Sequence, residues 1–160
     1  MQLVIISGRS GSGKSIALQA LEDLGYYAID NLPAMLLGSL VDELRDQGDR
    51  AHLAVSIDAR NLPGALERLP SLLDELRQRK IDFQVIYLTT DARILLERYS
   101  ATRRRHPLTR DSEMTLEEAI NKEETTLEDI RDLADLLIDT SRLSVHDLRR
   151  RITDQVAHQR

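Results

Sequence analysis

The segment that most constrains this chain is a glycine-rich loop close to its N-terminus. Residues 8–15 read G-R-S-G-S-G-K-S and satisfy the pattern G-x-x-x-x-G-K-[ST] in full. An apolar run, residues 3–6, precedes the loop, and an amphipathic segment, residues 16–24, follows it. Glycines let successive backbone N–H groups turn toward phosphate oxygens, and the N-terminus of a following helix adds its positive end. The pattern therefore predicts a phosphate-binding loop between a strand and a helix.

The motif assigns roles to the last two residues of this loop. We expect Lys14 to reach the β- and γ-phosphates of a nucleoside triphosphate and Ser15 to ligate Mg²⁺. We also expect Lys14 to be an exposed loop residue, whose replacement removes nucleotide affinity and leaves the fold intact. The predicted nucleotide-binding residues of the loop are Gly8, Arg9, Ser10, Gly11, Ser12, Gly13, Lys14 and Ser15.

Short apolar runs alternate with longer amphipathic segments along the rest of the chain. The runs predict five strands, at residues 3–6, 26–30, 53–58, 81–89 and 136–139. The segments between them predict helices at residues 16–24, 33–48, 63–79, 91–104, 115–133 and from 144 onward. Pro70 should break or restart the third of these, and Thr115 with Glu118 should form a capping box. Strands separated by helices of this length favour a three-layer α/β/α fold of the P-loop NTPase type, similar to small kinases, with a five-stranded parallel sheet.

Composition narrows the class of protein. At 160 residues and 41% hydrophobic content, the chain suits a single domain, residues 1–160. The last helix has no clear stop signal, which suggests the N-terminal part of a longer chain. The absence of cysteine excludes disulfides, thiolate zinc sites and thiol catalysis, and it fits a reducing cytoplasm. No apolar run is long enough to span a bilayer, and a net charge of −5 with 3% aromatic residues disfavours a general nucleic-acid binder.

Two carboxylates at predicted strand ends are candidates for the chemistry next to the loop. Asp58 ends a strand that resembles a Walker B strand, so it is a candidate to hold Mg²⁺ or to orient water. Asp30 ends the second strand, where some small P-loop kinases hold a base that contacts their acceptor. Each could equally be an acidic residue that caps the turn after a strand.

Charged clusters supply the remaining candidates. Arg98, Arg103, Arg104 and Arg105 fall where P-loop kinases carry a lid, and we select Arg103 and Arg104 as catalytic candidates that stabilise the transferred phosphoryl group. A solvated helix end and a contact to RNA phosphates are alternative uses. We expect residues 149–151, all arginine, to be exposed, and we interpret the N-K-E-E segment at residues 121–124 and the acidic stretch at residues 111–135 as surface.

Six segments together resemble the RapZ/YvcJ family of bacterial nucleotide-binding proteins. They are residues 7–15 (SGRSGSGKS), 20–27 (ALEDLGYY), 30–33 (DNLP), 55–61 (VSIDARN), 98–108 (RYSATRRRHPL) and 134–141 (ADLLIDTS). The resemblance covers essentially the whole chain. Because members of this family have a second, C-terminal domain, it implies that this chain corresponds to their N-terminal domain.

The resemblance carries its own expectations about function. It implies binding of ATP and GTP, weak hydrolysis at most, and a role in an RNA-binding adapter that presents a small regulatory RNA to an endoribonuclease and so tunes amino-sugar metabolism. We also expect a cytoplasmic protein that forms a homo-oligomer and does not bind a membrane. In the family, the segment matching Asp58, Ala59, Arg60 and Asn61 is described as a GTP site. From the residues alone, one site shared by Asp58 and Lys14 is simpler, and both assignments stay open.

Three functions therefore remain in view. The first is a regulatory nucleotide-binding module, which the resemblance favours. The second is a small-molecule kinase, since Asp30, the lid arginines and the loop occur in a kinase-like order. The third is an interaction scaffold with a vestigial loop, which an absence of nucleotide binding would favour.

Overall fold

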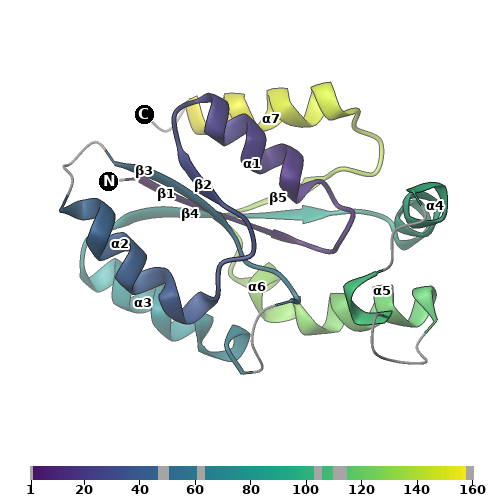
Figure 1. The fold of residues 1–160 in the computed structure, drawn as a ribbon, viewed down its shortest axis with the longest axis horizontal. Helices are drawn as coiled ribbons and strands as arrows, with labels where there is room; N and C mark the ends of the chain where they lie inside the picture. The colour runs from purple at the N-terminus through teal and green to yellow at the C-terminus, as the bar shows by residue number, and fades with distance from the viewer. Residues whose placement is uncertain (1, 47–50, 61–63, 103–105, 110–114, 158–160) are drawn as a thin grey trace.

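A computed structural model describes residues 2–46, 51–60, 64–102, 106–109 and 115–157 of the chain (Figure 1). Five strands form one sheet in the order β2-β3-β1-β4-β5, and every pair in it is parallel. The strands are β1 (Gln2–Gly8), β2 (Tyr27–Ile29), β3 (His52–Ser56), β4 (Asp82–Thr89) and β5 (Leu136–Asp139). This arrangement confirms the predicted P-loop NTPase-like α/β fold, and it brings the carboxyl ends of the strands to one edge.

Helices cover both faces of the sheet (Figure 1). On one face lie α1 (Lys14–Asp23) and α7 (Val145–Ala157). On the other lie α2 (Leu37–Arg45), α3 (Leu69–Gln78), α5 (Leu116–Thr126) and α6 (Glu128–Asp132). Helix α4 (Ala92–Thr102) follows β4 near the carboxyl edge, and three 3-10 turns, Ala34–Leu36, Leu66–Arg68 and Pro107–Thr109, complete the described part.

The central strand shows how the sequence fills two cores. Side chains alternate across a strand, so Leu3 and Ile5 of β1 pack with the cluster under α2 and α3. Val4 and Ile6 pack with the cluster under α1 and α7. Because both faces are covered, the strand is an unbroken apolar run rather than an alternating one.

Most predicted elements are confirmed, and local chemistry explains one exception. Thr115 caps α5 by accepting a hydrogen bond from the Glu118 backbone N–H at 3.2 Å, and α3 begins at Leu69, directly before Pro70. The single helix predicted over residues 115–133 is wrong, because α5 ends at Thr126 and α6 begins after Leu127. The Thr125 and Thr126 hydroxyls donate to carbonyls one turn earlier, a bond that bends helices.

No helix in the described residues combines the length and the apolar character that crossing a membrane requires.

Candidate functional site

The glycine-rich loop joins the carboxyl end of β1 to the first turn of α1. Gly8, Gly11 and Gly13 all have positive φ values, of 152°, 87° and 109°. A Cβ on Gly8 would lie 2.6 Å from the Leu88 carbonyl oxygen and 2.6 Å from Ser12 Oγ, so the backbone approach excludes any side chain. Gly13 is the N-cap of α1 and supplies no capping side chain. The first N–H groups of α1 therefore meet no side-chain cap, as a phosphate-binding helix terminus requires.

The side chain of Lys14 folds back against the loop and is buried there. Its ammonium donates to the carbonyl oxygens of Gly8 at 2.9 Å and Arg9 at 3.1 Å, and the residue is only 8% exposed. The expectation of an exposed lysine is therefore wrong, because the side chain folds back under the loop. Burial lowers the pKa of Lys14, and the nearby charges of Asp58 and Glu123 offset only part of that effect.

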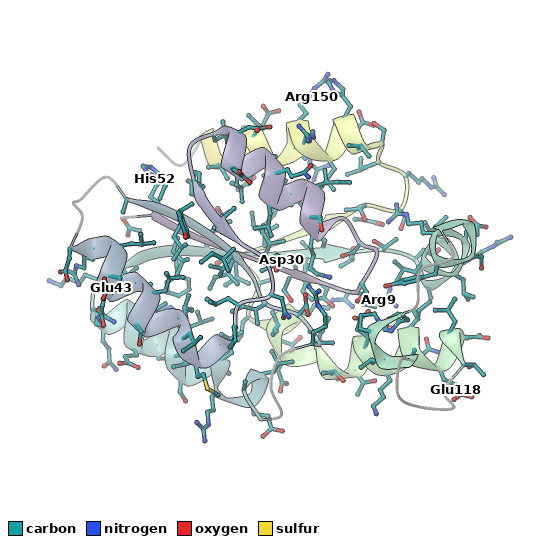
Figure 2. All side chains as sticks on the ribbon, in the orientation of Figure 1. Arg9, Asp30, Glu43, His52, Glu118 and Arg150 are labelled. Atoms are coloured by element: carbon teal, nitrogen blue, oxygen red, sulfur yellow. The ribbon has the colours of Figure 1, made fainter. Side chains whose placement is uncertain are left out.

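The two predicted carboxylates share one hydrogen-bond network at the ends of β2 and β3. Arg60 donates through Nε to Asp58 Oδ1 at 3.0 Å and through Nη2 to Asp58 Oδ2 at 2.7 Å. The same Nη2 lies 3.4 Å from Asp30 Oδ2. Ser56 Oγ donates to Asp30, which ties this carboxylate to the end of β3. The guanidinium therefore bridges the two carboxylates that the sequence selected separately (Asp30 is labelled in Figure 2).

Burial separates the roles of these two carboxylates. Asp58 is 1% exposed, whereas the Asp30 side chain is 49% exposed and open to a ligand. Burial raises the pKa of Asp58, but the hydrogen bonds from Arg60 and the charge of Lys14 outweigh it and leave the pKa below its usual value. The Asp58 carboxylate is therefore held in its charged form by Arg60 and Lys14, which does not suit it to proton transfer.

Other predicted residues fall in different surroundings. Ser15 is exposed at the first turn of α1. Ala59 packs against the apolar core. Arg9, labelled in Figure 2, donates to the Thr90 carbonyl oxygen and lies 3.5 Å from Glu124 of α5. Its side chain thus holds the loop to its neighbours. Arg103, Arg104, Arg105 and Asn61 lie outside the described residues.

Arg98, a member of the arginine cluster, anchors the loop from α4. It donates to the Gly11 carbonyl oxygen at 2.6 Å and to the Thr140 carbonyl oxygen at 3.1 Å. Thr140 in turn donates through Oγ1 to the Ser12 carbonyl oxygen at 2.7 Å. Helix α4 and the turn after β5 therefore both fix the middle of the loop.

The second arginine group, residues 149–151, is only partly as predicted. Arg150 and Arg151 are exposed, and Figure 2 shows Arg150 pointing away from the sheet. Arg149 is half-buried, and its guanidinium lies 3.3 Å from Asp23 of α1.

Glu123 is the residue that sequence reasoning missed. The structure contradicts its interpretation as surface: it is 0% exposed, and its carboxylate accepts hydrogen bonds from Ser10 and His106. A periodic signal was present, because position 123 lies three residues after the buried Ile120 and four before the buried Leu127, the spacing of one helix face. The charge of the residue obscured that signal.

Glu123 gives the domain a defined pH dependence. Burial raises the pKa of Glu123, but the hydrogen bonds from His106 and Ser10 and the charge of Lys14 lower it by more. The pKa therefore lies below its usual value of 4.5. Because the folded-state pKa lies below the unfolded one, the ionised carboxylate stabilises the fold above about pH 4.5 and that contribution is lost as the pH falls. We expect Glu123→Gln to be less stable than wild type at pH 7 and to lose less stability between pH 5 and 3. The wild-type slope should exceed that of the variant by up to about 1.4 kcal/mol per pH unit.

Chemical unfolding at a series of pH values measures both slopes. Parallel curves for the two proteins would show that Glu123 does not titrate differently in the folded and unfolded states.

Comparison with known sequences identifies relatives across the whole chain. A family model described as the RapZ-like N-terminal domain matches residues 1–160. A nucleotide-binding protein of Chromohalobacter salexigens is 74% identical over 158 residues, 98% of this chain and 53% of that relative. A nucleotide-binding protein of Tolumonas auensis is 50% identical over 157 residues, 98% of this chain and 54% of that relative. The chain thus spans about half the length of the curated relatives it matches.

Solved structures with the same fold include small kinases. A shikimate kinase from Acinetobacter baumannii in complex with shikimate superposes with a TM-score of 0.61 at 19% identity, over 99% of this chain and 94% of the other. A gluconokinase from Sinorhizobium meliloti gives a TM-score of 0.58 at 19% identity, over 99% and 93%. At these identities the likeness establishes the fold alone.

Proposed function

Because the chain belongs to the family of RapZ-like N-terminal domains, we propose that it is the nucleotide-binding regulatory domain of a longer, RNA-binding adapter protein. In this proposal it binds ATP or GTP with Mg²⁺ at the loop of residues 8–15 and hydrolyses them weakly at most. The observation that carries the proposal is the complete phosphate loop, with Lys14 buried beneath it and within the electrostatic reach of Asp58. Such a loop binds phosphate through backbone N–H groups and one lysine.

The residues present fit a nucleotide with its metal. A Cβ at Gly8 would meet the Leu88 carbonyl oxygen and the Ser12 hydroxyl, so this position requires the glycine that the phosphate-loop pattern has there. Ser15 and Asp58 offer a hydroxyl and a carboxylate, the oxygen ligands that Mg²⁺ prefers. When bound, Mg²⁺ would neutralise phosphate charge, and Lys14 would hold the phosphates. On sequence grounds we propose that Arg103 and Arg104 add positive charge over the triphosphate.

We propose one nucleotide site and not two. The charges of Asp58 and Lys14 lie close enough to shift each other's pKa, so Asp58 borders the phosphate loop. Arg60 is already paired with Asp58 and Asp30, and Ala59 packs against the core. In a shared site, the phosphates of ATP and of GTP bind to the same loop, and contacts outside the loop select the base.

The regulatory role follows if nucleotide occupancy changes how the longer protein binds RNA. We propose that RNA and an endoribonuclease bind to it in the cytoplasm, through a homo-oligomer whose RNA contacts lie mainly outside this domain. In a protein of the relatives' full length that contains this domain, saturating ATP should change RNA affinity by about 5-fold or more, the usual size of allosteric coupling. Lys14→Ala should abolish the change, and electrophoretic mobility shift in constant salt measures it. ATP that binds without altering RNA affinity would contradict the role.

A small-molecule kinase is the second candidate, and the network of Asp30 with Arg60 favours it. The Asp30 carboxylate and the Arg60 guanidinium are both partly exposed at the carboxyl edge of the sheet. A carboxylate could accept a proton from a hydroxyl while a guanidinium holds an anionic group of the same molecule. Nucleotide turnover that rises sharply on addition of hydroxylated phosphate acceptors would favour this candidate over the regulatory one.

A further inference from the structure

Glu123 on α5 contacts a loop that lies more than a hundred residues earlier in the chain. Its Oε1 accepts from the Ser10 backbone N–H at 2.7 Å and lies 3.1 Å from His106 Nε2. Its Oε2 accepts from Ser10 Oγ at 2.6 Å. Both carboxylate oxygens therefore have donors, and two of those three donors belong to one residue of the phosphate loop.

A buried carboxylate at this position requires an explanation beyond packing. Taking an ionised carboxylate out of water is unfavourable unless its hydrogen bonds are complete. A leucine or methionine at position 123 would be buried without that penalty, as are Ile120 before it and Leu127 after it. What the carboxylate adds is a fixed acceptor for the loop.

Two backbone N–H groups of the loop already have acceptors within the protein. The Ser10 N–H is directed to Glu123, and the Ser12 N–H donates to the Arg9 carbonyl oxygen at 3.0 Å. The turn around Gly11 is therefore held on one side by Glu123 and on the other by Arg98. Ser10 stays in place only while its acceptor does, because its N–H and hydroxyl have the same partner.

His106 extends this contact to the segment after α4. Its Nδ1 accepts from the Leu108 backbone N–H at 3.1 Å, so Nε2 carries the proton that is donated to Glu123. The His106 ring also lies 5.3 Å from the Tyr99 ring of α4, measured between centroids. The carboxylate thus connects the loop, α5 and the turn that contains His106.

We propose that Glu123 is the positioning residue of the phosphate site. Its carboxylate holds Ser10, and with it the first half of the loop, in the conformation that receives the phosphates of a nucleotide, and it joins this loop to His106. Glu123 does not touch the nucleotide and acts through Ser10. This inference rests on the nucleotide binding proposed above.

The test replaces the acceptor without changing its shape. Glu123→Gln keeps the size of the side chain but places an amide N–H₂ against donors, and we expect it to weaken ATP binding by about tenfold or more. Without nucleotide, the Ser10 amide proton should exchange with solvent faster in this variant than in wild type. Glu117→Gln, an exposed position on the same helix, is the matched control and should change neither quantity.

A double-mutant cycle separates positioning from general stabilisation. Ser10→Ala alone should weaken ATP binding several-fold, but it should add much less in the Glu123→Gln background, because the two residues act as one unit. Additive losses would mean that Glu123 only stabilises α5, and this would overturn the proposal. Unchanged ATP affinity and unchanged Ser10 amide exchange in Glu123→Gln would overturn it too.

Two further outcomes keep the two proposals distinct. If Glu123→Gln did not fold, Ser10→Ala would replace it, and unchanged ATP affinity there would count against Glu123. If the wild-type chain bound no ATP, the proposed function would fall. Amide exchange at Ser10, which needs no nucleotide, would still decide whether Glu123 positions the loop.

Discussion

Lys14→Ala is expected to weaken Mg-ATP binding by roughly 100-fold, about 2.7 kcal/mol, since a charge-assisted contact to phosphate is lost from a site sheltered from water. The lysine is already positioned by the Gly8 and Arg9 carbonyl oxygens, so little ordering of the side chain is needed when a phosphate arrives. Isothermal titration with ATP and Mg²⁺ measures the loss.

The same substitution should leave the fold in place. Burial lowers the pKa of Lys14, which means that the surroundings disfavour its charge even with Asp58 and Glu123 nearby. Removing the ammonium relieves that penalty and offsets the two hydrogen bonds lost to the loop carbonyls. The unfolding temperature of Lys14→Ala should therefore stay within a few degrees of wild type. Lys122→Ala, at an exposed lysine on α5, is the control, and equal affinity losses in the two variants would contradict a specific phosphate contact.

Gly8→Ala is expected to have the largest effect on stability, roughly 2–4 kcal/mol, because it combines backbone strain with a steric clash. The φ of Gly8 is 152°, and an added Cβ would lie 2.6 Å from the Leu88 carbonyl oxygen, which belongs to the neighbouring strand and cannot rotate away. The sheet must open or the loop must move, and nucleotide binding should be lost together with stability. Chemical unfolding and ATP titration measure the two effects.

Gly38→Ala provides the matched comparison. Gly38 lies in α2, and apart from its chain neighbours and the backbone of its own helix, no atom of the described residues lies within 4 Å of the position of its added Cβ. Alanine favours helices over glycine, so this variant should be neutral or more stable by at most about 1 kcal/mol. If Gly8→Ala were as stable as Gly38→Ala, the close approach of β1 and β4 at this loop would be in error.

The features that sequence predicted well depend on local pattern. Residues 8–15 identify the loop because its chemistry requires glycines and a lysine at fixed spacing. The capping pair Thr115 and Glu118 is equally local, since donor and acceptor lie three residues apart. Parallel strands follow from the alternation of apolar runs with helical segments. None of these inferences requires knowledge of which segments meet in space.

The features that sequence did not predict depend on tertiary contact. Glu123 belongs to the buried face of α5 by its periodicity, but an acidic residue in an acidic segment indicates solvent unless a donor is known. Its donor, Ser10, is 113 positions away. Lys14 was expected to be exposed because a lysine in a loop usually is, and only the folded loop supplies the two carbonyl oxygens that hold it. Likewise, Asp30 and Asp58 were selected one by one, and the structure adds Arg60 as the group between them.

The central claim is that this domain binds a nucleoside triphosphate at the loop of residues 8–15. Calorimetric titration of the 160-residue chain with ATP and GTP, with and without Mg²⁺ and followed by a turnover assay on the same samples, tests it most directly. We predict saturable binding at one site, strengthened by Mg²⁺, weakened roughly 100-fold in Lys14→Ala and accompanied by negligible turnover. An absence of binding, or undiminished binding in Lys14→Ala, would contradict the account.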